Sequence, residues 1–162
     1  MIQRATFRQQ PPAKLLKLGV MRAAFALGGR FAPFQTVESA ARLFATPFAS
    51  SRSRARAIRT DEEMQRCEIT AGEQTIATYV WGDPSREPYA LLVHGWSSFG
   101  LRFLPWVEQL RKAGLAVVTF DQPGHGYSPG ELCTLPHFIN TIHARAMRIG
   151  SQPISVGFPE KP

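Results

Sequence analysis

The chain has 162 residues, of which 44% are hydrophobic and 19% are charged. This length fits one domain with a buried core, and the composition excludes a chain that is disordered throughout. No run of 18 apolar residues is present, which argues against a transmembrane helix, and the two cysteines, Cys67 and Cys133, are too few for a disulfide scaffold. We expect both thiols to be reduced, in the cytoplasm.

The net charge of +7 is concentrated in the first third of the sequence. Residues 1–60 hold eleven lysines and arginines and one acidic residue, Glu38, whereas residues 61–162 hold eight basic and eleven acidic residues. The sequence therefore predicts a basic N-terminal helical segment with a linker over 1–60, followed by a mildly acidic globular domain over 61–162.

The basic segment predicts two short helices. Apolar residues recur at helical spacing over 13–26, and Gly28 and Gly29 are expected to end this helix. A second helix is predicted over 37–44. Residues 49–59 alternate arginine with small residues and are predicted to form a linker or a frayed helix.

The pattern then changes to that of an α/β domain. β-forming residues at 67–70 and 75–81 predict a hairpin. Apolar runs at 89–93 and 115–120 predict two fully buried strands, with an amphipathic helix between them over 101–113. Strand, helix and strand in this order form a βαβ unit, so we expect these strands to be parallel.

One more helix and one weak strand are predicted after a loop rich in glycine and proline. Apolar residues recur at helical spacing from Leu135 to Ile149, with Thr134 as the predicted N-cap and Gly150 as the stop. Residues 152–158 are the candidate for a further strand. The predicted fold class is therefore α/β.

Two glycine-rich loops follow the two buried strands. Residues 94–100 read HGWSSFG and residues 121–130 read DQPGHGYSPG. Ligands of open α/β sheets bind at the carboxyl ends of the strands, and glycines let a ligand approach the backbone. For a single His-Gly pair, a tight turn is the simpler explanation, so it is the pair of loops that favours a functional site.

Three consecutive features resemble the α/β-hydrolase family: the sequence YALLVHGW, an amphipathic helix after it, and then the sequence LAVVTFDQPGHGYSPG. The resemblance covers about half of the chain, from the hairpin to the helix that follows the second loop. It implies an incomplete α/β-hydrolase sheet, made of the N-terminal hairpin and the βαβ unit and preceded by two short helices. It also implies an oxyanion-hole loop of His94, Gly95 and Trp96, in which the donor is the backbone N–H of Trp96.

The second loop is expected to be structural. The resemblance gives this role to Asp121, Gly124, His125 and Gly126. His125 is not expected to be the catalytic base, because the triad of this family follows in the order Ser, Asp or Glu, and His, all later in the chain.

No catalytic nucleophile is predicted in these residues. Ser128 satisfies the pattern G-x-S-x-G, but it is followed by Pro129, which has no N–H to act as the second oxyanion donor. Ser128 also lies well beyond its strand, with no helix directly behind it. Ser155 lacks both glycines of the pattern. We therefore reject both serines.

The resemblance implies serine-dependent hydrolysis of an ester, amide or thioester, which needs no metal and no organic cofactor. Because the nucleophile, acid and base are missing, we expect a truncated or frameshifted chain that is inactive by itself, and a small-molecule acyl substrate only for a completed enzyme. The alternative is a non-catalytic hydrolase-like module that binds a partner or an anionic membrane through its basic helices. The four histidines lack metal-ligand spacing, so no metal site is predicted.

Three explanations of the basic segment stay open. It is a solvated face of helices that pack on the domain, a surface for anionic membranes over residues 13–59, or a nucleic-acid site around Arg52, Arg54, Arg56 and Arg59. Nucleic-acid binding is the least favoured, since no aromatic residues lie between these arginines. We also expect self-association, because a sheet without its later strands leaves an open edge.

Overall fold

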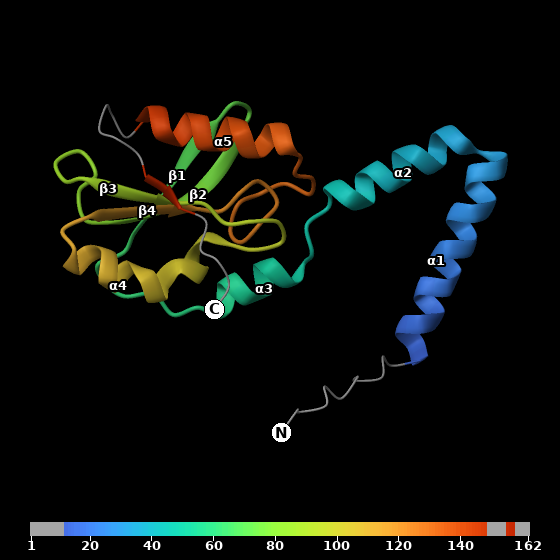
Figure 1. The fold of residues 1–162 in the computed structure, drawn as a ribbon, viewed down its shortest axis with the longest axis horizontal. Coiled ribbons are helices and arrows are strands. Elements are labelled where there is room, and N and C mark those ends of the chain that lie inside the picture. The colour runs from blue at the N-terminus through green and yellow to red at the C-terminus, as the bar shows by residue number, and fades with distance from the viewer. Residues whose placement is uncertain (1–11, 149–154, 158–162) are drawn as a thin grey trace, which may run out of the picture. The chain divides into compact units, whose positions relative to one another are not determined.

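The structure of this chain is a computed structural model that describes residues 12–148 and 155–157 (Figure 1). The chain divides into two compact units, Met1–Phe44 and Ala45–Pro162. The described part of the first unit is helical, and the second unit contains the sheet and both glycine-rich loops. The boundary that we placed after residue 60 therefore falls within the second unit.

Two long helices form the described part of the first unit, α1 (Pro12–Phe31) and α2 (Pro33–Ala45). The prediction that Gly28 and Gly29 end the first helix is wrong, because α1 runs through both. A Cβ atom at Gly28 would lie 2.5 Å from the hydroxyl oxygen of Thr36. The glycine thus allows α1 and α2 to approach each other closely at their corner, instead of stopping the helix.

Both helices expose large apolar side chains. No residue of α2 is buried, so the apolar stripe predicted over 37–44 exists but is not covered. The exposed apolar residues of this unit are Leu15, Leu16, Leu18, Val20, Met21, Leu27, Phe31, Phe34, Val37, Leu43 and Phe44. Within residues 12–148 and 155–157, no helix combines the length and the apolar character needed to cross a bilayer.

A third helix, α3 (Ser50–Ala57), precedes the sheet. It occupies the segment that we predicted to be a linker or a frayed helix, so the chain has three helices here and not two short ones. Ser51 and Ala55 are buried, one helical turn apart. This buried face is small and partly polar, and hydrophobic periodicity therefore does not reveal it.

The second unit is built on a mixed sheet with the strand order β1-β2-β4-β3-β5. The strands are β1 (Gln65–Ala71), β2 (Gln74–Trp81), β3 (Tyr89–Leu92), β4 (Ala116–Phe120) and β5 (Ser155–Gly157). β1 and β2 form the predicted antiparallel hairpin, and β4 pairs antiparallel with β2. β3 pairs in parallel with both β4 and β5. The predicted α/β fold class is confirmed.

The predicted βαβ unit links β3 to β4. Its helical part begins with a 3-10 turn, Gly100–Phe103, and continues as α4 (Leu104–Lys112). The last long helix is α5 (Leu135–Arg148), and the predicted stop at Gly150 lies outside the described residues. At the start of α5, Thr134 donates its backbone N–H to Nδ1 of His137 at 3.1 Å, which is one half of a capping box.

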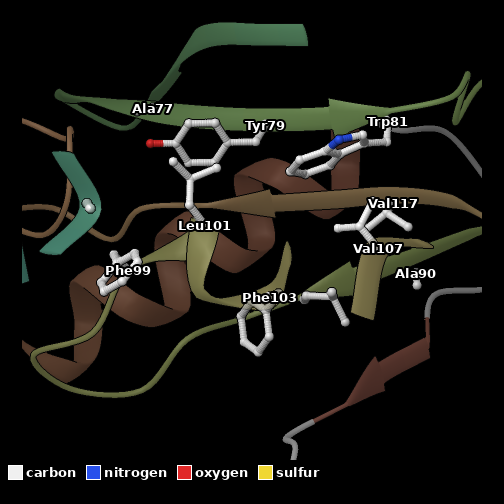
Figure 2. Packing of buried hydrophobic residues seen from close by; sticks show 11 residues of the cluster. Ala77, Tyr79, Trp81, Ala90, Phe99, Leu101, Phe103, Val107 and Val117 are labelled. Carbon is white, nitrogen blue, oxygen red and sulfur yellow. The ribbon is translucent and has the colours of Figure 1, made fainter. Parts of the chain in front are cut away.

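Both faces of the sheet carry buried cores. One cluster includes Tyr79, Trp81 and Val117 from the strands, together with Phe103 and Val107 from the βα connection (Figure 2). The cluster on the opposite face includes the following buried residues: Ile76, Val80, Leu91, Val118 and Phe120. α4 and α5 lie on opposite sides of the sheet (Figure 1). Adjacent strand residues thus alternate between two covered faces, as parallel sheets require.

Candidate functional site

The two glycine-rich loops lie side by side, because they leave the carboxyl ends of the neighbouring parallel strands β3 and β4. Each loop holds the other through one histidine. Nε2 of His94 accepts the backbone N–H of Gln122, and Nε2 of His125 accepts the backbone N–H of Ser97, both at 3.0 Å. The two imidazole rings lie 5.1 Å apart. The histidines therefore tie the two loops into one unit.

Both histidines are held as the same neutral tautomer. Nδ1 of His94 lies 2.8 Å from the carbonyl oxygen of Gly95, and Nδ1 of His125 lies 2.9 Å from that of Pro123. A carbonyl only accepts, so each Nδ1 donates its proton and each Nε2 is left to accept. Burial lowers the pKa of His94 to about 3 and also lowers the pKa of His125. Both rings are therefore neutral near pH 7.

Asp121 is the buried centre of the second loop. Its carboxylate accepts the backbone N–H of Gly100 at 2.6 Å, the backbone N–H of Tyr127 at 2.8 Å and the hydroxyl of Tyr79 at 2.6 Å. Burial raises the pKa of the Asp121 carboxyl, while these hydrogen bonds act in the opposite direction. Gly126 has a φ of 47°, and a Cβ there would collide with the carboxylate. Asp121 thus links β2, the βα connection and its own loop.

Ser128, the serine that we reject as nucleophile, is fully buried. Its hydroxyl donates to the carbonyl oxygen of Asp121 at 2.6 Å and accepts the backbone N–H of Ala77 at 2.9 Å. Its proton is therefore directed to a backbone carbonyl and not to a base. The other rejected serine, Ser155, lies in β5, and its side chain is outside the described residues.

The first loop contains an unusual backbone conformation at Ser97. Its φ is 51°, in the left-handed region that residues with a Cβ rarely adopt. Gly95, in contrast, has no positive φ, and among the described residues other than its two chain neighbours nothing lies within 4 Å of where its Cβ would be. Within residues 12–148 and 155–157, neither a positive φ nor close packing therefore explains this glycine.

Aromatic rings from both loops and from α5 contact one another beside the first loop. The side chain of Trp96 is 42% exposed, stacks on Phe138 with ring centres 6.3 Å apart, and meets His125 edge-on at 5.4 Å. Phe138 also makes edge contacts with His94 and His125. The sequence predicts Phe138 only as part of a helical apolar stripe, and its place beside the loops was not foreseen.

Two arginines of α3, which the sequence suggested only as part of a nucleic-acid site, also bond to the loops. Arg52 donates from Nε to the carbonyl oxygen of Gly124 at 3.2 Å and from Nη2 to that of Gly130. Arg54 donates from Nη2 to the carbonyl oxygen of Ser97 at 2.8 Å. The sequence gives only an indirect sign of these bonds. Two buried small residues one turn apart, Ser51 and Ala55, orient α3 on the domain.

Groups for a metal or a reactive thiol do not gather at the loops. Within the part of the chain that the structure describes, no three His, Cys, Asp or Glu side chains are placed to hold a metal ion. Cys67 is exposed and Cys133 is buried, and neither forms a disulfide. Burial raises the pKa of Cys133 to about 12, so its thiol stays protonated.

Comparison with known proteins places these loops in a familiar fold. The family model for the serine aminopeptidases of family S33 matches residues 85–143. The pimeloyl-[acyl-carrier protein] methyl ester esterase of Xylella fastidiosa (strain 9a5c) is 42% identical over 59 residues, which cover 35% of this chain and 23% of that protein.

Solved structures agree with this match. The thioesterase domain from the curacin biosynthetic pathway has a TM-score of 0.53 at 26% identity, covering 57% of this chain and 34% of that one. The Pyrococcus furiosus esterase Pf2001 has a TM-score of 0.50 at 25% identity, with coverages of 58% and 40%. An epoxide hydrolase of Vigna radiata shares the fold at 17% identity, with a TM-score of 0.53 and coverages of 59% and 30%.

The mixed sheet and the paired loops at the carboxyl ends of β3 and β4 agree with an α/β-hydrolase fold. The resemblance to the α/β-hydrolase family is confirmed over residues 85–143, and the similarity is to esterase-like members. It spans about a quarter of the curated relative that it matches and about a third of the thioesterase domain.

Proposed function

We propose that residues 94–97 contribute a backbone donor to the oxyanion hole of a serine-dependent hydrolase of esters, amides or thioesters. The N–H of Trp96 hydrogen-bonds to the carbonyl oxygen of the substrate as that oxygen becomes negative in the tetrahedral intermediate. Esters and thioesters are favoured as substrates, because the relatives include a methyl ester esterase and a thioesterase domain. The mechanism uses no metal and no organic cofactor.

The observation that carries this proposal is the contrast between Gly95 and Ser97. At Gly95 the backbone borders open space, so a carbonyl group can approach it. At Ser97 the backbone is held in the left-handed conformation, with its N–H already committed to His125. An oxyanion donor is effective when it is fixed before the charge develops, and a rigid residue directly after the donor supplies that fixation.

We assign the nucleophile, the acid and the base to no residue of this sequence. The hydroxyl of Ser128 is buried and bonded to the backbone on both sides, which supports its rejection. The 162 residues by themselves are therefore expected not to hydrolyse esters. Asp121, Gly124, His125 and Gly126 serve to shape the second loop and through it the first.

A chimera tests this function. Residues 85–143 replace the corresponding segment of the Xylella fastidiosa esterase, which keeps its own nucleophile, acid and base. We expect the folded chimera to retain kcat/KM within about tenfold of the parent enzyme, since the oxyanion loop is equivalent. A folded chimera without turnover would contradict the proposal.

The isolated chain supplies the complementary test. Hydrolysis of p-nitrophenyl acetate by the 162-residue chain is expected to equal that of its Ser128→Ala variant. Turnover that disappears in Ser128→Ala would identify Ser128 as a nucleophile and overturn its rejection.

A second function is favoured by the surface of the first unit: adsorption to an anionic membrane. α1 and α2 expose large apolar side chains, and the basic residues among them are Lys14, Lys17, Arg22, Arg30 and Arg42. Apolar side chains beside basic ones suit the interface of an anionic bilayer. Arg52 and Arg54 bond to the loops, so we confine the proposed membrane surface to α1 and α2. Self-association through the same apolar residues is the competing outcome.

A further inference from the structure

α3 contacts both glycine-rich loops through two arginines that lie two positions apart in the helix and reach one loop each. Arg52 reaches the second loop and bonds to two carbonyl oxygens of that loop, those of Gly124 and Gly130. The planar guanidinium suits this task, because its N–H groups point in fixed and different directions. Arg52 thereby joins the two ends of the turn that carries His125.

Arg54 reaches the first loop. Its Nη2 donates to the carbonyl oxygen of Ser97 at 2.8 Å, while its Nε donates to that of Ser50 in the same helix at 3.1 Å. The guanidinium also lies 5.6 Å from the ring centre of Phe99. A bond within its own helix therefore orients the Arg54 side chain toward the loop.

Ser97 is held from three directions. Its N–H donates to His125 at 3.0 Å, its hydroxyl accepts the backbone N–H of Phe48 at 3.0 Å, and its carbonyl accepts Arg54. A left-handed residue with a side chain persists only where its surroundings determine it. These bonds fix the peptide that joins Trp96 to Ser97. The N–H of Trp96 belongs to the preceding peptide, which is thereby restrained from its C-terminal side.

We propose that Arg52 and Arg54 are positioning residues for the candidate oxyanion loop. Arg54 holds Ser97 directly, and Arg52 holds the turn whose histidine accepts the Ser97 N–H. Together they maintain the left-handed conformation of Ser97 and so restrain the C-terminal side of Trp96, whose N–H is the candidate donor. The inference rests on the proposed function, because this restraint bears on catalysis only where Trp96 donates to an oxyanion.

The test uses the full chain labelled with ¹⁵N, in the variants Arg52→Gln, Arg54→Gln and Arg56→Gln. Arg56 is the matched control, since it is an exposed arginine of the same helix with no side-chain bond in the described residues. We expect Arg52→Gln and Arg54→Gln to accelerate hydrogen exchange of the Ser97 amide at least about tenfold. The Nε2 resonance of His125 moves in both variants as its acceptor bond is lost. Arg56→Gln changes neither signal.

Amides of β4 report whether each variant is folded, and Arg52→Lys and Arg54→Lys provide milder changes if a glutamine variant unfolds. We expect Arg52→Lys to behave like Arg52→Gln, because one ammonium group cannot reproduce the guanidinium fork. Faster exchange in α3 with unchanged Ser97 and His125 signals would show that the arginines only anchor the helix, and would overturn the proposal. None of these signals depends on turnover, so failure of the proposed hydrolase function is detected separately by the chimera.

Discussion

The two units of this chain treat their polar and apolar groups in opposite ways. In the second unit, the buried carboxylate at the centre of the loops is fully paired, since Asp121 accepts three hydrogen bonds from three segments. In the first unit, α1 and α2 expose their apolar side chains, and α2 buries no residue. A fully paired buried carboxylate favours a rigid pair of loops, whereas uncovered apolar side chains on a helix are the kind of surface that a partner or a membrane covers.

The largest expected effect is the loss of Asp121. Asp121→Ala removes the acceptor of two backbone N–H groups and one buried hydroxyl, and it should lower the free energy of unfolding by about 3 kcal/mol or more. Urea denaturation measures this. Asp83→Ala is the control, because this exposed carboxylate bonds within its own turn and its loss should cost far less stability than that of Asp121. Equal effects of the two variants would contradict the central role of Asp121.

Acid should weaken the second unit through His94. The folded protein lowers the pKa of His94 from 6.5 to about 3, so between these values the unfolded chain binds the additional proton. Stability is therefore present above pH 6.5 and falls as the pH drops, by about 2 kcal/mol between pH 7 and pH 5.

Denaturant titrations across this range measure the slope for the parent chain and for two variants. His94→Gln should flatten the slope, whereas the exposed His143→Gln should not. An unchanged slope in His94→Gln would assign the acid sensitivity to another group.

Two glycines of the first loop, Gly95 and Gly100, differ in the space available for a Cβ atom, and their alanine variants test this difference. A Cβ at Gly100 would lie 2.9 Å from the carbonyl oxygen of Phe120, whereas one at Gly95 meets nothing within 4 Å. Gly100→Ala should therefore lower stability by about 1–2 kcal/mol, and Gly95→Ala by less than about 0.5 kcal/mol. Thermal unfolding of the two variants decides this. A destabilised Gly95→Ala variant would mean that the fold, and not a ligand, explains the glycine.

A modest effect on binding, and not on stability, is expected at the surface of the first unit. Lys17→Gln and Arg22→Gln should each weaken binding to phosphatidylserine-containing vesicles about fivefold, because one basic residue near such a surface contributes about 1 kcal/mol. Co-sedimentation at increasing salt measures the partition coefficient. Glu38→Gln is the control of opposite sign and should strengthen binding. No binding of the parent chain would leave the exposed helices to self-association or to a solvated role.

The strands and the two loops were predictable from the sequence. Buried strands have short apolar sequences, and each loop begins directly after such a strand. The order of the strands was not, since nothing in the local pattern of β4 says that it lies between β2 and β3. The continuation of α1 through Gly28 depends on Thr36, a contact between helices.

The candidate site shows the same limit. His94, Gly95 and Trp96 were assigned through the resemblance of this loop to the α/β-hydrolases, whereas Arg52 and Arg54 bond to backbone carbonyls far along the chain. A bond from a side chain to a carbonyl leaves no pattern in the sequence of either segment. The left-handed conformation of Ser97 was equally hidden, because it arises from contacts made by three other segments and not from the residue type.

The most direct test of the account is the turnover of the chimera with and without Gly95→Val. The account places the substrate carbonyl in the open space beside Gly95, so the valine should lower kcat/KM at least about tenfold while the unfolding midpoint stays unchanged. Equal kcat/KM for the two chimeras, at equal stability, would show that no reacting group approaches the backbone at this loop.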